Sequence, residues 1–151
     1  MVKTFLFAFN LMLFGCAASP YFTTDQNRPE PSLRIKSLKV MHTGVYSGDI
    51  AADETPSLCH DFVLTKAEVL NFFKTARSAT LREYEHDLIA SNCYISGLFE
   101  SEGGVKGAWK IDRARRGLLL FSDGASKYYF CGECENKLFY ESCDVDCIHS
   151  P

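Results

Sequence analysis

The alternation of apolar and polar side chains that starts at residue 33 predicts a β-strand. Leu33 and Ile35 alternate with basic residues, and Leu38 and Val40 resume the alternation one position out of phase. Because successive side chains of a strand point to opposite faces of the sheet, this shift would turn the second pair away from the core. One extra residue in the strand restores the facing, so the sequence predicts a β-bulge near Ser37.

A helix over residues 66–78 is the clearest element that the pattern predicts. Thr65 and Glu68 have the spacing of a capping box, in which each side chain bonds a free backbone amide of the other residue. Leu64 and Val69 flank this cap as a hydrophobic staple. Apolar side chains then recur at the helical spacing that places them on one face: Val69, Phe72, Phe73 and Ala76.

The rest of the chain predicts short strands joined by turns. Val45 and Tyr46 predict a short second strand, and the polar residues 47–57 and 80–87 predict connections. Five apolar segments follow, separated by turn-forming residues: 93–99, 105–111, 117–121, 127–131 and 138–140. The fold class that we expect is α+β, an antiparallel β-sheet meander of about five or six strands packed against one main α-helix. The first strand is expected at an edge of the sheet.

Residues 1–15 have the composition of an export signal rather than of a folded element. Lys3 is their only charged residue, and an apolar run from Thr4 to Phe14 is broken only by Asn10. The run is too short for a membrane span, which needs about 20 apolar residues. A positive start, a short apolar stretch and a small residue at its end are typical of a secretory signal peptide.

The four residues Leu13-Phe14-Gly15-Cys16 resemble the lipobox of bacterial lipoproteins. The resemblance implies that the thiol of Cys16 receives a diacylglycerol and that the signal is removed just before it. Ala17 at the next position implies sorting to the outer membrane, with the domain on its periplasmic face. Residues 16–32 contain three prolines and form the expected lipidated tether, and residues 33–151 form one globular domain.

Charge and size narrow the possible partners. The full chain of 151 residues has a net charge of −3, and loss of residues 1–15 removes one lysine. The chain lacks the excess of basic residues that is typical of nucleic-acid binding, so we expect no nucleic-acid partner. The expected contacts are the membrane, through the N-terminal lipid, and a protein partner in the periplasm.

Six cysteines remain after Cys16, and their even number in an exported chain predicts a disulfide framework. They are Cys59, Cys93, Cys131, Cys134, Cys143 and Cys147. Six cysteines allow 15 pairings, and the sequence does not choose among them. The last eleven residues are mostly polar, so we expect bridges from Cys143 and Cys147 to hold that segment to the domain.

Two other interpretations of the cysteines remain open. Cys131 and Cys134 have the spacing of a redox pair, although such a pair should open a helix, and the sequence after it predicts turn and strand. Together with Cys143 and Cys147 they also have a spacing of four thiolates that suits zinc. We expect structural disulfides, and no metal or cofactor, because an oxidising compartment disfavours free thiolates.

The sequence contains no assembled catalytic constellation, and we expect no enzymatic activity. His60-Asp61 and His86-Asp87 are two His-Asp pairs, which metal phosphohydrolases use on helical bundles, but this chain predicts one helix. We interpret both pairs as surface groups.

Arg113, Arg115 and Arg116 cluster in one predicted turn, which we expect to be a solvated hairpin tip. A contact patch for an acidic protein is the alternative. Because Trp109 and the run that starts at Tyr128 alternate between the faces of a sheet, at least one of these aromatic rings should point away from the core. These five residues are the candidate partner-binding residues.

The function that we expect is a lipid-anchored periplasmic protein-binding module, of the inhibitor, immunity or accessory-subunit type. Two alternatives remain: a redox-active or zinc-binding envelope protein that uses Cys131 and Cys134, and a structural envelope lipoprotein.

Overall fold

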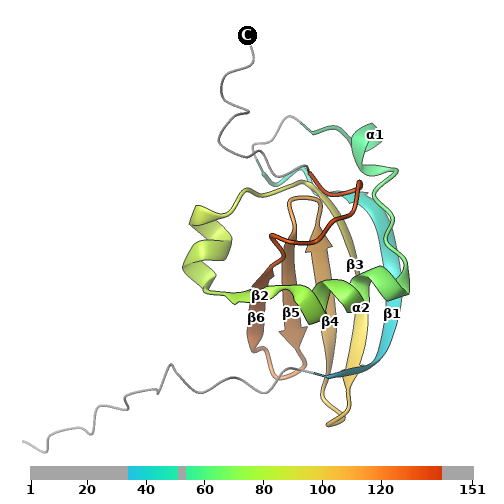
Figure 1. The fold of residues 1–151 in the computed structure, drawn as a ribbon, viewed down its shortest axis with the longest axis vertical. Coiled ribbons are helices and arrows are strands. Elements are labelled where there is room, and N and C mark those ends of the chain that lie inside the picture. Colours follow the sequence, from blue (N-terminus) through green and yellow to red (C-terminus); the bar gives the residue numbers. More distant parts are fainter. Residues whose placement is uncertain (1–33, 51–53, 141–151) are drawn as a thin grey trace, which may run out of the picture. The chain divides into compact units, whose positions relative to one another are not determined.

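A six-stranded antiparallel sheet with one main helix across it forms the body of the protein (Figure 1). The computed structural model describes residues 34–50 and 54–140. The strands are β1 (Ile35–Tyr46), β2 (Arg77–Ala79), β3 (Cys93–Ser101), β4 (Lys106–Asp112), β5 (Arg116–Phe121) and β6 (Ser126–Phe130). The helices are α1 (Pro56–Cys59), α2 (Lys66–Thr75) and the single π-helical turn η1 (Glu83–Asp87). The order β1-β3-β4-β5-β6-β2 confirms the expected antiparallel sheet, with the first strand at an edge.

The helix α2 begins as the sequence predicts and ends earlier. The Thr65 side chain accepts a hydrogen bond from the Glu68 amide at 3.3 Å, and the Glu68 carboxylate accepts one from the Thr65 amide at 2.7 Å, which completes the capping box. The predicted end at residue 78 is wrong, because the backbone turns extended at Ala76. Residues Arg77–Ala79 instead form β2 and pair with β6. Ala79 would continue the helical spacing, but residues 77–79 pair with Tyr128–Phe130 of β6, so strand pairing replaces the helix there.

Strand β1 is long and irregular. The register against β3 shifts between Ile35 and Ser37, which confirms the predicted bulge. Residues 45 and 46 belong to the end of the same strand, so the prediction of a separate second strand is wrong. Gly44 has a φ of +59°, and a Cβ there would lie 2.7 Å from the carbonyl oxygen of His60. A glycine therefore lets the segment after α1 pack directly on β1, where the Gly44 amide donates to Phe62 O at 3.0 Å.

Strands β3 to β6 form the predicted meander, but residues 138–140 are not a strand. They lie in turns that follow the Cys131–Cys134 disulfide, and the Tyr140 amide donates to the carbonyl of Arg113 at 3.0 Å. The chain after β6 thus folds back across the end of the sheet instead of adding to its edge. The turn η1 lies within the predicted connection 80–87, and α1 begins within the predicted connection 47–57. Four or five residues are too few to show a helical period.

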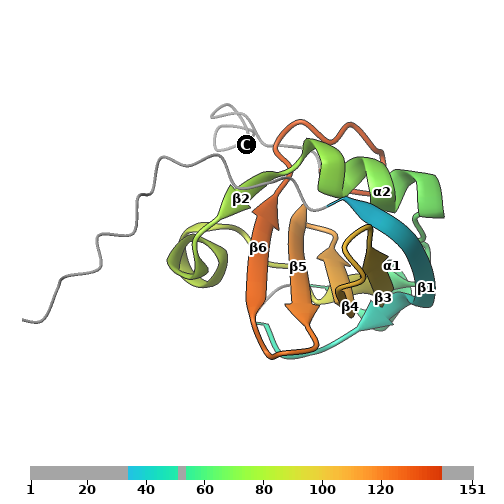
Figure 2. The same ribbon diagram turned by 90° about the horizontal axis from the view of Figure 1, so that it is seen from below.

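The core lies between α2 and one face of the sheet (Figure 2). Phe72 of α2 packs in the same buried cluster as Trp109 of β4 and Leu119 of β5, and each of the three is about 1% exposed. Gly117 makes this approach possible, since a Cβ at that position would lie 2.5 Å from the Phe72 ring. Among the described residues, no helix is long and apolar enough to cross a membrane.

Candidate functional site

The face of the sheet opposite α2 carries a row of side chains that none of the described helices covers. Five residues lie directly opposite one another across β1, β3, β4, β5 and β6, and we call them the open row: Lys39, Leu98, Ala108, Leu120 and Ser126. Their neighbours along each strand point to the core, so strand alternation turns all five outward. Leu98 is 50% exposed and Leu120 is 45% exposed. The open row is therefore an apolar centre between two polar ends.

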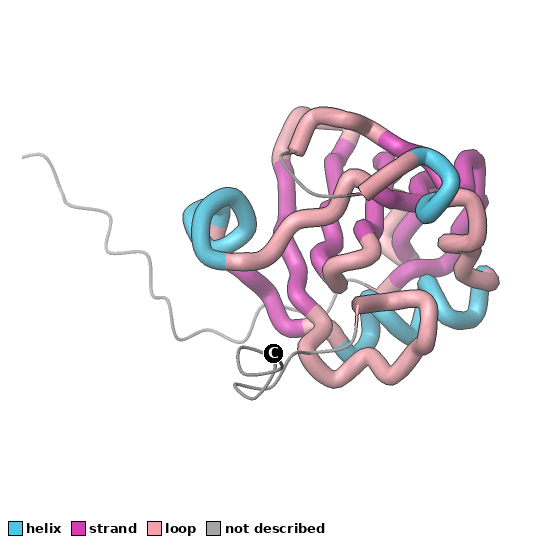
Figure 3. The backbone as a smooth tube through the Cα atoms, turned by 90° about the horizontal axis from the view of Figure 1, so that it is seen from above, coloured by secondary structure: helices cyan, strands magenta, loops and turns pink. Residues whose placement is uncertain are grey.

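The other end of this face is covered by the chain itself. The Tyr84 ring of η1 lies 4.9 Å from the Tyr128 ring of β6, and Leu118 beside it is half-buried. Figure 3 shows η1 at the β2 and β6 side of the sheet, away from α2. Apolar side chains at this end are thus shielded, whereas those of the open row are not.

Arg116 is buried, which corrects the expectation of a solvated hairpin tip. Its Nε donates to Asp112 Oδ2 at 2.7 Å, and a terminal nitrogen donates to the carbonyl of Tyr84 at 2.7 Å. The guanidinium also stacks over the Tyr84 ring at 4.5 Å. The side chains of Arg116 and Asp112 are 9% and 1% exposed, so this ion pair is an internal support of the β4–β5 turn.

The other two arginines of the turn also bond to the chain. Arg113 donates to the carbonyl of Leu138 at 3.1 Å and lies over the Tyr140 ring, and Arg115 donates to the carbonyl of Gly132 at 3.0 Å. The residues after β6 supply these acceptors, because that segment folds back over the turn. The arginine cluster therefore holds the end of the described chain in place and is not a free contact patch.

The two candidate aromatic residues do not form an exposed hot spot. Trp109 is 1% exposed, and its Nε1 donates to the carbonyl of Leu98 at 3.2 Å. Tyr128 faces outward but is half-buried beneath Tyr84. The outward-facing apolar residues that sequence reasoning missed are Leu98 and Leu120. Their alternation with buried neighbours was visible, but the pattern did not say which face the helix covers.

The described cysteines form two disulfides, as the sequence led us to expect for this part of the chain. Cys59 joins α1 to Cys93 at the start of β3, and Cys131 joins Cys134. Residues 132–139 contain turns and no helix, so the 131–134 pair does not open a helix as a redox pair should.

The two disulfides also bear on the interpretation of the cysteines as a zinc site and on the bridges expected from Cys143 and Cys147. A disulfide between Cys131 and Cys134 leaves neither as a thiolate ligand for zinc. All four described cysteines are paired with one another. The expected bridges from Cys143 and Cys147 fall on residues outside the described part of the chain and stay a prediction. Cys16, Cys143 and Cys147 lie outside the described residues.

The two His-Asp pairs lie apart on the surface. His60 Nδ1 lies 3.1 Å from Asp61, with both side chains nearly fully exposed, whereas His86 is nearest Glu85, at 3.9 Å. Within residues 34–50 and 54–140, no group of three or more potential ligands could hold a metal ion.

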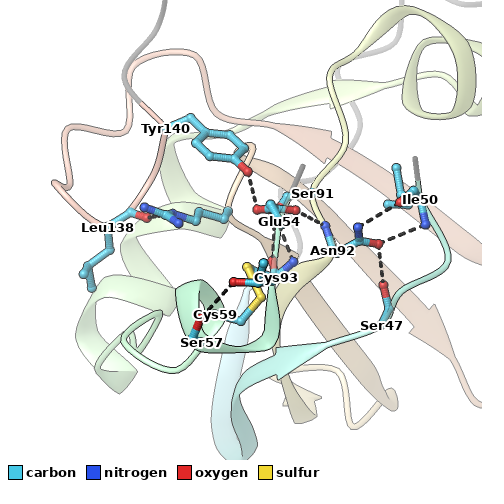
Figure 4. The surroundings of a disulfide bond; sticks show 12 residues. Ser47, Ile50, Glu54, Ser57, Cys59, Ser91, Asn92, Cys93, Leu138 and Tyr140 are labelled. Carbon is cyan, nitrogen blue, oxygen red and sulfur yellow. Dashed lines mark hydrogen bonds between the residues drawn. A yellow bond between two sulfur atoms is a disulfide. The ribbon is translucent and has the colours of Figure 1, made fainter. Parts of the chain in front are cut away.

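A buried network around Glu54 is the other feature that sequence reasoning missed (Figure 4). Glu54 is 8% exposed, and its carboxylate accepts hydrogen bonds from the Ser91 hydroxyl at 2.6 Å, the Asn92 amide and the Tyr140 hydroxyl. The four residues come from three segments far apart in the sequence, so no local pattern signals the network. It joins the start of α1, the approach to β3 and the last described residue.

Hydrogen bonding outweighs burial at Glu54. Burial alone would raise the pKa of this carboxyl, but the bonds from Ser91, Tyr140 and Asn92, with the charge of Arg113, hold the pKa below its ordinary value of 4.5. Burial and the bond to Glu54 raise the pKa of Tyr140 to about 12, so its hydroxyl keeps its proton. The network is thus a charged acceptor held by neutral donors.

Replacing Glu54 by glutamine is expected to cost about 1–3 kcal/mol at neutral pH, because the amide presents a donor where the carboxylate accepted one. A carboxyl whose pKa is lower in the folded state than in the unfolded state stabilises the protein at pH values above its unfolded pKa. This stabilisation is lost as the pH falls through the folded pKa. The free energy of unfolding, measured with urea between pH 6 and pH 3, should therefore fall more steeply with decreasing pH for the wild type than for Glu54→Gln. Glu135→Gln, at an exposed carboxylate, is the control. Parallel curves for wild type and Glu54→Gln would contradict the role of the network.

Comparisons of the chain with protein-family models, with curated proteins and with solved structures each found no match.

Proposed function

We propose that this chain is a lipid-anchored domain on the periplasmic face of the outer membrane that binds a protein partner and has no catalysis of its own. The lipobox-like segment that ends at Cys16 supports the anchor, and multiple acyl chains hold a protein to a bilayer far better than one. Two disulfides in the described residues suit an oxidising compartment.

The observation that carries the binding role is the open row. Leu98 and Leu120 are exposed to about half their area on adjoining sides of Ala108, in the middle of a rigid sheet. Exposed apolar side chains that adjoin each other and are rimmed by polar residues are typical of protein interaction sites. Their strands hold them in fixed positions, which lowers the entropy cost of binding.

The buried ionisable groups support a binding role over an enzymatic one. Among the described residues, the buried carboxylates are those of Glu54 and Asp112, and both are held by donors of the chain itself. These internal bonds give both carboxylates a structural role. A general acid or base must instead contact a substrate. The inhibitor, immunity and accessory-subunit types of binding protein all fit a small domain with one such surface.

Site-specific photocrosslinking in the native envelope tests the proposal. Benzoylphenylalanine at position 98 is expected to give an adduct with another protein, and position 120 should give the same adduct. Position 58 is the matched control, because Leu58 of α1 is 51% exposed and lies outside the open row. The absence of a protein adduct from positions 98 and 120, or an equal yield of the same adduct from position 58, would overturn the proposal.

A further inference from the structure

Lysines flank the apolar centre of the open row. Lys39 lies directly opposite Leu98 within the row. Lys106 and Lys110 lie two positions to either side of Ala108 on β4, so strand alternation turns them to the same face. Cross-strand neighbours on one face lie about 5 Å apart and diagonal neighbours about 7–8 Å apart, within reach of a lysine side chain. Lysine residues thus lie on more than one side of the two leucines.

Two carboxylates of this face, Glu100 and Asp112, are already matched by cations of the chain. Glu100 lies between Lys36 and Lys106, with an ammonium nitrogen 3.9 Å from each of its oxygens. Asp112 is paired with Arg116 in the buried bridge. The face therefore has an excess of positive charge, although the chain as a whole has a net charge of −3.

Lys39 and Lys110 make no ion pair with any carboxylate in the described part of the chain. Asp49 adds a favourable field at Lys110 but is not within ion-pair distance. The Lys110 ammonium lies 4.1 Å from the centroid of the Tyr94 ring, and burial lowers the pKa of Lys110. A partly desolvated cation of this kind gains more from an incoming anion than one surrounded by water does.

We propose that the partner of the open row is an acidic protein surface, whose carboxylates meet Lys39 and Lys110 around an apolar side chain seated on Leu98 and Leu120. This inference rests on the proposed function and names the chemistry of its partner. An apolar centre with a charged rim is the usual anatomy of a protein interface, and opposite charge on the rim steers the encounter.

Two other candidate partners of the open row are a second copy of the chain and an anionic lipid surface, and both fit it less well than an acidic protein does. A second copy of the chain that used the same face would place Lys39 and Lys110 against like charges, which disfavours self-association through the open row. An anionic lipid surface shares the charge preference. However, the exposed leucines lie within strands of the sheet rather than at the tips of its turns, and this favours a protein partner.

The test compares charge reversal with charge conservation in the anchored, full-length protein in its native envelope. The photocrosslinker is placed at position 120, and the yield of the protein adduct is measured for Lys39→Glu, Lys39→Arg and the double variant Lys39→Glu/Lys110→Glu. Lys39 is exposed, so its replacement leaves the core untouched. Formation of the Cys59–Cys93 bond and the midpoint of thermal unfolding are followed to show that each variant folds.

The adduct yield is expected to fall at least tenfold in the double variant, to fall by less in Lys39→Glu and to stay unchanged in Lys39→Arg. Raising the ionic strength should lower the wild-type yield, because salt screens the rim charges. An undiminished adduct in a folded double variant would overturn the acidic partner while leaving the proposed function in place. A wild-type adduct with lipid or with a second copy of the chain would overturn the inference, and no adduct from positions 98 and 120 would overturn both proposals.

Discussion

Replacement of Arg116 by alanine is expected to lower the free energy of unfolding by about 3–5 kcal/mol. The substitution leaves the carboxylate of Asp112, which is 1% exposed, without its charged partner. It also removes the hydrogen bond to the carbonyl of Tyr84 and the stacking over the Tyr84 ring. Urea unfolding at neutral pH measures the loss, and Arg82→Ala, at an exposed arginine, should change stability by no more than about 0.5 kcal/mol.

The dependence on pH distinguishes an unpaired charge from a simple loss of packing. Burial raises the pKa of Asp112, and the loss of the Arg116 charge would raise it further. A carboxyl with a raised folded pKa destabilises the protein when it is ionised, so the deficit of Arg116→Ala should shrink as pH falls and Asp112 takes up a proton. A deficit that stays constant with pH, or one below about 1 kcal/mol, would show that the pair does not support the turn.

Removal of the Cys59–Cys93 disulfide is expected to cost about 4 kcal/mol, and removal of the Cys131–Cys134 disulfide about 2 kcal/mol, in the chain-entropy account. The difference follows from the sequence separations of 34 and 3 residues, because closing a longer loop restricts the unfolded chain more. The double variants Cys59→Ala/Cys93→Ala and Cys131→Ala/Cys134→Ala form a matched pair for urea unfolding. Equal losses, or a larger loss for the 131–134 pair, would contradict this account.

The parts of the fold that depend on local pattern were predictable from the sequence. The capping box of Thr65 and Glu68 fixed the start of α2, and the phase change after Ile35 predicted the bulge of β1. Strands β3 to β6 followed from apolar segments between turn formers. The end of α2 was not predictable, because pairing of Arg77–Ala79 with β6 depends on a strand about fifty residues further along.

The candidate site was less predictable, because its properties depend on what covers each surface. Arg116 has the sequence context of an exposed turn, and only the Tyr84 segment and Asp112 explain its burial. Leu98 and Phe99 are adjacent apolar residues of β3 that point to opposite faces of the sheet. The position of α2 decides which of them is exposed. The Glu54 network likewise joins segments that no short-range pattern relates.

Export and lipid anchoring are the central claim on which the binding proposal depends. The mass of the protein isolated from its native envelope, together with its disulfide-linked peptides, tests this claim most directly. The account predicts a chain that begins at Cys16, carries the added mass of a diacylglycerol, and contains peptides linked through Cys59–Cys93 and Cys131–Cys134. A chain that begins at Met1, with no fatty acid and with Cys59, Cys93, Cys131 and Cys134 as free thiols, would contradict it.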